Sequence, residues 1–255
     1  MSKMQANKVD LSREEEIFRF EVEFMHKYLK HFEQSIIHHD KVLKKALLED
    51  IEYAGKHNAS ILESIYNNDI LKIPSLGYNS SLLLIYSLLE STLLKICSEL
   101  HKQLKLPLEL AEIKGGNYFE SSLKYLQTFT ALNDDLYHLG KDFVPYQKIR
   151  NYIAHNGAVI PNGSENAKNK LFASSITYNN DGSFYINNIK FLKAFLSKVE
   201  KFIYGCVKLI GQLNITPVKV QVGTIIKYYN EEEYDSLYTT PTLLVPEKDD
   251  DDMPF

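Results

Sequence analysis

Arg150, Asn151 and His155 are the residues of this chain best equipped for chemistry, and they stand within six consecutive positions. The guanidinium of Arg150 is a planar fork of donors that suits a phosphate, and the imidazole of His155 can carry a proton near neutral pH. The amide of Asn151 can orient either group. This combination is suited to handling a phosphodiester, with charge neutralised by the arginine and a proton moved by the histidine.

The spacing of these residues limits how one helix could bring them together. Residues 145–156 are patterned as a helix, and Gly157 follows where a helix C-cap is expected. Asn151 and His155 share a face of that helix, whereas Arg150 and His155 lie about 140° apart around its axis. Either the arginine reaches round the helix, or the helix is irregular, or two copies face each other. The third arrangement predicts a homodimer with a shared cleft.

Apolar spacing predicts that helices must position these residues. Helices are expected from residue 12 to about 40, then over 41–66, 79–104, 118–132, 145–156 and 189–213, with breaks at 67–69 and 74–77. Ser12 and Glu15 fit a capping box at the first helix. The helix over 79–104 is apolar almost all round, which is typical of a central helix. Residues 176–186 predict a small β-hairpin.

Two further residues are candidates for the same site. Glu90 lies within the apolar central helix, where a carboxylate needs a partner. Arg150 is one candidate partner, and a lysine at an exposed edge of the helix is the other. Tyr152 could stack on a nucleic-acid base, or its ring could belong to the core.

The Arg-Asn-x-x-x-His pattern at 150–155 resembles the motif of the HEPN family of ribonucleases. The acidic residue in the apolar helix over 86–94, the lead-in over 146–149 and a hairpin followed by a long helix are also similar to the family. The resemblance covers residues 75–215. It implies an all-α, HEPN-like helical bundle with a β-hairpin insertion and an N-terminal helical extension.

The resemblance also implies a function. It implies a cytoplasmic, metal-independent endoribonuclease without a cofactor, acting in anti-phage defence or toxin-type growth arrest. The ribose 2′-OH would attack the phosphodiester, with His155 as the general base or acid and Arg150 neutralising the phosphate. Asn151 would orient His155 or the phosphate.

The end of the chain carries a second resemblance. The net formal charge of −4 divides into −8 on the last 25 residues and +4 on residues 1–230, so a mildly basic body that could bind RNA precedes an acidic tail. The last seven residues resemble the C-terminal tip of bacterial single-stranded DNA-binding protein (SSB), a docking peptide for replication and repair proteins. They are Asp249, Asp250, Asp251, Asp252, Met253, Pro254 and Phe255. A tail that covers the RNA site, or that only solubilises the protein, is the alternative.

The sequence therefore divides into an N-terminal helical region over 1–74, an HEPN-like domain over 75–215, and an extended segment with an acidic tail over 216–255 that is expected to be disordered beyond residue 230. Residues 1–74 could be a partner helix, a sensor or a dimer arm. Two other functions stay open. One is a non-catalytic helical adaptor for SSB-interacting proteins, and the other is an HEPN toxin silenced by an antitoxin partner.

The remaining composition argues against other classes of site. Cys97 and Cys206, the only cysteines, lie in apolar helical patterns, so we expect buried thiols in a reducing cytosol. The histidines at 26, 31, 38 and 39 fit no strong ligand spacing, so we expect a solvated helix face and no metal. The longest uninterrupted apolar run, residues 82–86, is too short to span a bilayer, so no membrane contact is expected.

Overall fold

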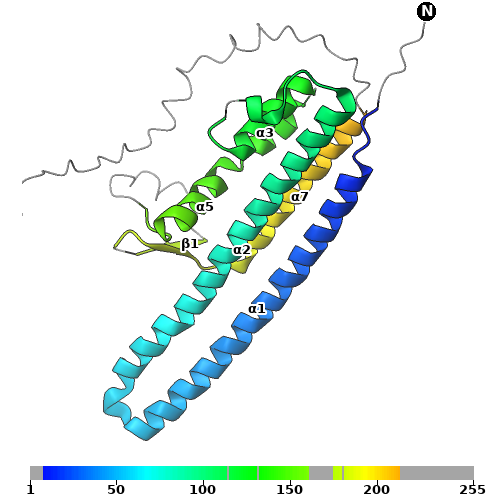
Figure 1. Ribbon diagram of the computed structural model, residues 1–255. Coiled ribbons are helices and arrows are strands. Elements are labelled where there is room, and N and C mark those ends of the chain that lie inside the picture. Colours follow the sequence, from blue (N-terminus) through cyan, green and yellow to red (C-terminus); the bar gives the residue numbers. More distant parts are fainter. Residues whose placement is uncertain (1–7, 114, 131, 161–174, 180, 213–255) are drawn as a thin grey trace, which may run out of the picture. The chain divides into compact units, whose positions relative to one another are not determined.

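The computed structural model describes residues 8–113, 115–130, 132–160, 175–179 and 181–212. In this part the protein is mostly helical, with six α-helices and a two-stranded antiparallel hairpin (Figure 1). The expected extended segment and acidic tail over 216–255 lie outside the described residues, so the disorder expected there stays a prediction.

Two long helices, α1 (Ser12–Ala54) and α2 (Ala59–Leu104), form an antiparallel hairpin. Its turn consists of Gly55, at a φ of 85°, and a short 3₁₀ helix (Lys56–Asn58). The breaks expected near residue 41, at 67–69 and at 74–77 are wrong, because α1 runs through the first and α2 through the other two, with Pro74 inside α2. Packing of each helix along the other outweighs the local preference of turn residues, and a proline removes only one helical hydrogen bond.

The first helix also begins differently from the expected capping box. Leu11 occupies the N-cap position, and no side chain caps the helix from there. The carboxylate of Asp10 instead accepts the backbone N–H of Ser12 at 3.0 Å. Ser12 is therefore the first helical residue and not the cap.

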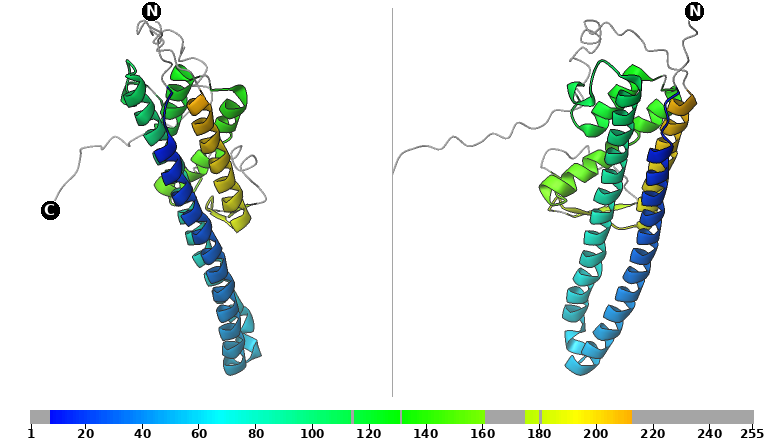
Figure 2. Two further views of the ribbon diagram at one scale, coloured as in Figure 1. Left: turned by 90° about the vertical axis from the view of Figure 1, so that its right-hand side faces the viewer. Right: turned by 45° about the vertical axis from the view of Figure 1, so that its right-hand side comes forward.

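A third long helix, α7 (Ile189–Gln212), packs against both α1 and α2 along part of their length (Figures 1 and 2). Buried side chains of α1 end at Leu29, and those of α2 begin at Tyr78. We call residues 30–77 the arm, because beyond the ion pair of Glu33 with Lys193 of α7 the two helices continue without a third. All described residues belong to one compact unit, and a separate role for residues 1–74 stays a prediction.

Three shorter helices complete the bundle: α3 (Tyr118–Phe129) and α5 (Val144–Asn156) pack against α2, and α4 (Asp134–Lys141) packs against α7. A 3₁₀ turn (Leu110–Glu112) precedes them. Asn117 caps α3, and Asn133 caps α4 by accepting the N–H of Leu136 at 3.0 Å. The sequence analysis missed α4, because eight residues are too few for a periodic apolar signal.

Aromatic rings join these helices to the bundle. The ring of Tyr146 on α5 stacks on Phe195 of α7 with centroids 4.1 Å apart. Phe143, directly before α5, meets Phe202 of α7 at 5.4 Å and Phe119 of α3 at 5.6 Å. Each such pair adds about 0.5–1.5 kcal/mol beyond the apolar area that it buries. The start of α5 is therefore fixed to two neighbouring helices.

The small sheet pairs β1 (Ile176–Tyr178) with β2 (Phe184–Ile186), as the hairpin prediction expected. Gly182, at a φ of 83°, lies in the turn between them.

One described helical segment, Ile73–Leu104, is long and apolar enough by length and composition to cross a membrane. Its longest uninterrupted apolar run is only residues 82–86, so run length alone does not reveal the segment. In the structure 56% of its most apolar window is buried inside the protein. The segment packs against α1, α3, α5 and α7, as the core helix of a bundle does.

Gly77 permits a close approach of α1 and α2 at the root of the arm. A Cβ at this position would lie 2.0 Å from Cζ of Phe32, whose ring packs against Tyr78 at 5.5 Å. Gly77→Ala gains about 1 kcal/mol of helix propensity but loses about 1–3 kcal/mol to overpacking, so we expect a net loss of about 1 kcal/mol in urea unfolding. Gly211→Ala is the control, because a Cβ there meets nothing within 4 Å. Equal effects of the two substitutions would contradict the close approach.

Candidate functional site

Helix α5 carries the Arg-Asn-x-x-x-His motif over the range that the sequence predicts, and it ends as predicted. Pro145 lies in its first turn, where a missing N–H costs nothing. Gly157 follows its last residue in the left-handed region, with φ 59° and ψ 34°. The N–H of Ala158 bonds to the carbonyl of Tyr152 at 2.9 Å, which satisfies a carbonyl of the last helical turn.

Arg150 lies in a defined setting between α5 and the central helix. Its Nη2 is 3.9 Å from Oε2 of Glu90 on α2, and its guanidinium carbon is 5.9 Å from the ring centre of Tyr86. The side chain of Arg150 is 31% exposed and that of Glu90 is 16% exposed. Of the two partners considered for Glu90, the arginine is therefore the one that the structure places beside it.

The charge on Glu90 is unfavourable where it lies. Burial raises the pKa of its carboxyl above the ordinary value, and Arg150 lowers that pKa only part of the way back. At 3.9 Å the ion pair is long, so it offsets only part of the cost of removing the carboxylate from water. The arginine is held in place while part of its donor fork stays exposed to solvent.

Asn151 contacts the arginine and not the histidine. Its Oδ1 accepts a hydrogen bond from Nη1 of Arg150 at 3.0 Å. Adjacent residues do not face each other on a helix, so the long arginine side chain folds back to make this contact. In this structure Asn151 helps to orient Arg150.

His155 is exposed in the last turn of α5, and within the described part of the chain it makes no hydrogen bond or ion pair. One copy of the protein does not join the imidazole to the guanidinium of Arg150. This agrees with the offset of about 140° expected for residues five apart on a helix. Any chemistry that uses both groups requires a substrate that spans them or a second copy.

The β-hairpin is attached to the end of α5 that carries His155. Residue Val159 forms a bridge with Ser183, and the N–H of Phe184 bonds to the carbonyl of Ala158 at 2.9 Å. The half-buried ring of Tyr152 meets that of Phe184 edge-on, with centroids 6.4 Å apart. Two roles were considered for Tyr152, stacking on a base and packing in the core. The structure shows a packing contact, which orients the end of α5. The sequence analysis missed this attachment, since Ala158, at a φ of 63°, gives no turn signal of its own.

The other residues with reactive groups lie apart from this site. Cys97 and Cys206 are buried free thiols, as expected, and burial raises the pKa of Cys97 to about 12. His26 of α1 hydrogen-bonds Glu200 of α7. Within the described ranges no group of three His, Cys, Asp or Glu residues could hold a metal ion.

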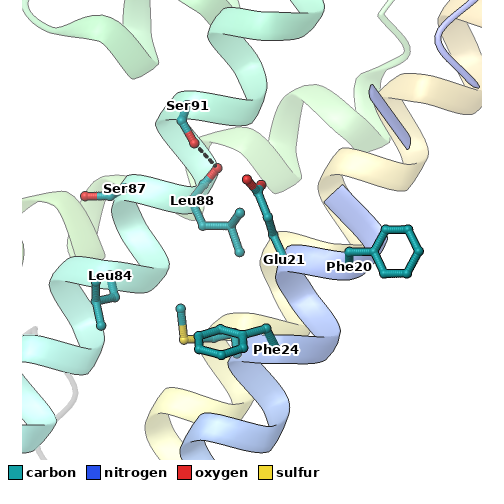
Figure 3. Close-up of a pocket in the computed structure, with 8 residues that line it drawn as sticks. Phe20, Glu21, Phe24, Leu84, Ser87, Leu88 and Ser91 are labelled. Carbon is teal, nitrogen blue, oxygen red and sulfur yellow. Dashed lines mark hydrogen bonds between the residues drawn. The ribbon is translucent and has the colours of Figure 1, made fainter. Parts of the chain in front are cut away.

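A groove of about 490 Å³ lies between α1 and α2, away from Arg150 and His155 (Figure 3). Its walls are mainly apolar; the residues that line it are Phe20, Glu21, Phe24, Met25, Leu84, Ser87, Leu88 and Ser91. Oε1 of Glu21 meets Nζ of Lys95 at 3.4 Å. The groove contains no cation of its own, so it does not suit a phosphate.

Comparisons with protein-family models, with curated proteins and with solved structures found no match to this chain. The seven tail residues 249–255 lie outside the described residues. The candidate site is therefore defined by α5, its contact with α2 and the attached hairpin.

The buried Glu90 predicts a pH dependence of stability. Its carboxyl holds a proton more tightly in the folded protein than in the unfolded chain, so the free energy of unfolding should fall as pH rises through the interval between the two pKa values. Arg150→Met removes the compensating cation and should raise the pKa of Glu90 further, which makes this fall larger. Urea unfolding between about pH 4 and 8 measures the effect, taking the ordinary glutamate pKa of about 4.3 as the lower limit. Glu90→Gln should remove this contribution, and an unchanged pH profile in Glu90→Gln would contradict the assignment.

The left-handed cap predicts which residues Gly157 can be exchanged for. A Cβ on Gly157 meets nothing within 4 Å, so the cost of substitution comes from the backbone conformation alone. Gly157→Ala should lower the free energy of unfolding by about 1 kcal/mol, because the left-handed region costs an ordinary residue about 1–2 kcal/mol. Gly157→Asn should lose less, since asparagine tolerates this region. Thermal unfolding of the three proteins tests the order, which a more stable alanine variant would reverse.

Proposed function

We propose that the protein is a metal-independent endoribonuclease of the HEPN type, with Arg150 and His155 as its catalytic residues. The observation that carries this proposal is the setting of Arg150, which is held by Glu90, Asn151 and the ring of Tyr86 while remaining partly exposed. A phosphate there would meet a preorganised guanidinium, and such donors stabilise charge as it develops on the phosphate.

The reaction follows from the chemistry of RNA. The ribose 2′-OH attacks the adjacent phosphorus, the bond to the 5′ oxygen breaks, and a 2′,3′-cyclic phosphate remains. His155 takes the proton of the 2′-OH or gives one to the leaving oxygen.

The separation of the two groups on one helix supports a homodimer as the active form. If two α5 helices face each other, the histidine of one copy can complete the phosphate site of the other. The arrangement is isologous, since each copy gives and receives the same group.

RNA cleavage by the purified full-length protein tests this function. We expect Arg150→Ala and His155→Ala each to lower the cleavage rate by at least about 100-fold, the usual contribution of a phosphate-neutralising or proton-transferring group. Cleavage should persist in EDTA and fail on an oligonucleotide with 2′-deoxyribose at the cut site.

Two exposed residues remote from the motif supply matched controls. Arg19→Ala on α1 and His138→Ala on α4 remove the same side-chain types and should leave the rate unchanged. Equal residual activity in His155→Ala and the unsubstituted protein would show that the cleavage comes from a contaminant, and the proposal would fail.

A second candidate function comes from the C-terminal residues. An acidic run that ends in Met253, Pro254 and Phe255 supports a docking role on proteins that bind the SSB tip. In anti-phage defence or growth arrest, such docking would place the ribonuclease at replication or repair machinery. The adaptor alternative predicts that deletion of Phe255 abolishes function while His155→Ala does not, and the toxin alternative predicts that a separate partner protein suppresses the cleavage.

A further inference from the structure

The arm is the part of the described structure with the least buried surface. Lys193 near the start of α7 pairs with Glu33 of α1 at 2.7 Å, and beyond this point α1 and α2 continue alone (Figures 1 and 2). None of the described side chains over residues 30–77 is fully buried. Most helical stability in proteins comes from packing of an apolar face, and a two-helix arm provides little of it.

Exposed apolar side chains are concentrated on this arm. It carries eight of the thirteen exposed large hydrophobic side chains of the described residues: Ile37, Val42, Leu48, Tyr53, Ile61, Ile65, Ile73 and Leu76. Single exposed hydrophobic residues are ordinary, but such a concentration marks an interaction surface.

One row of residues along α1 contacts α7 in the bundle and continues along the arm, where α7 is no longer beside it. In the bundle this row contacts α7, where His26 hydrogen-bonds Glu200 and Glu33 pairs with Lys193. Residues 37, 44 and 48 follow His26 by 11, 18 and 22 positions, which places them within about 40° of it around the helix axis. The row that α7 covers in the bundle therefore continues along the arm, where no described helix covers it, and Leu48 on it is 67% exposed.

Two blocks of opposite charge flank Leu48 along α1. Lys41, Lys44 and Lys45 come before Leu48, and Glu49 and Glu52 come after it. When two such helices run antiparallel, the basic block of each lies against the acidic block of the other, with the two-fold axis close to Leu48. The ion pairs within one helix, Lys44 with Asp40 and Lys45 with Glu49, are exposed and therefore weak, so they do not oppose this exchange.

We infer that the arm binds the arm of a second copy of this chain, with the two α1 helices antiparallel and Leu48 at the two-fold axis. In this arrangement α1 of the second copy takes, along the arm, the place that α7 occupies in the bundle. Such an interface is isologous, so each copy offers the same row and the same two charge blocks.

The expected affinity is modest. With Leu48 on the axis, the last 13 or so residues of α1 in one copy lie beside the same residues of the other copy, over a length of about 20 Å. This is smaller than a standard interface of about 800 Å² per partner, so we expect a dissociation constant in the micromolar range. The inference is independent of the ribonuclease proposal, because no residue of the arm takes part in the contacts described for Arg150 and His155.

Disulfide cross-linking of the full-length protein tests the register. The two native thiols are buried, so a cysteine introduced by Leu48→Cys is the exposed one. We expect Leu48→Cys to form a covalent dimer under mild oxidation, because residues on the axis meet their own copies within the roughly 7 Å that a disulfide needs. Gln34→Cys, also at an exposed position of α1, is the matched control. Residue 34 lies 14 residues, or about 21 Å, from the two-fold axis in each copy, so the two cysteines should be about 42 Å apart. No cross-link at position 48, or an equal cross-link at both positions, would overturn the inference.

Charge reversal tests the antiparallel pairing independently. The variant with Lys44→Glu and Lys45→Glu should no longer self-associate through the arm, and neither should the variant with Glu49→Lys and Glu52→Lys. Mixed together, the two variants should associate at least about 10-fold more tightly than either does alone, as followed by sedimentation and by cross-linking between their Leu48→Cys forms. A dimer formed through α5 would respond to neither change. Equal association of the mixed and unmixed proteins, with helical content unchanged by circular dichroism, would refute the charge pairing.

Discussion

The position of the candidate site depends on the aromatic rings packed between α2, α3, α5 and α7. The ring of Tyr86 on the central helix lies 6.4 Å from that of Phe195 and beneath the guanidinium of Arg150. Tyr146, one helical turn before Arg150, stacks on the same Phe195. Tyr86 therefore belongs to both the core and the site, and the arginine takes its orientation from the packing below it.

The Glu90 and Arg150 pair adds an electrostatic constraint to this packing. Neither charge is fully satisfied, since burial acts against the carboxylate and the pair is long. A well-buried apolar pair of similar size would often be more stable, so an arrangement of this kind suits a ligand that completes it. An anionic group placed over the exposed edge of the guanidinium would supply the missing hydrogen bonds.

Local signals in the sequence predicted the elements that depend on local interactions. The motif helix, its glycine cap, the hairpin and the long closing helix carry their own periodicity or turn residues, and the structure has each of them. The partnership of Arg150 with Glu90 could also be anticipated, because a carboxylate in an apolar helix needs a cation. The breaks expected near residue 41 and at 67–77 were wrong because the antiparallel neighbour stabilises both helices across weak local sequence. The attachment of the hairpin to α5 depends on tertiary pairing at Ala158, for which the sequence has no local pattern.

This attachment makes β2 a central strand with a neighbour on each side. Residues 183, 185 and 187 pair towards β1, whereas Gly182 and Phe184 bond to residues 158–160 on the opposite edge. Residues 160 and 175 thus lie on opposite sides of β2, two strand spacings or about 10 Å apart across the sheet, and they face positions 182 and 187, which are five residues or about 17 Å apart along the strand. The end of α5 that carries His155 is therefore fixed to the sheet by the hydrogen bonds of residues 158–160 themselves.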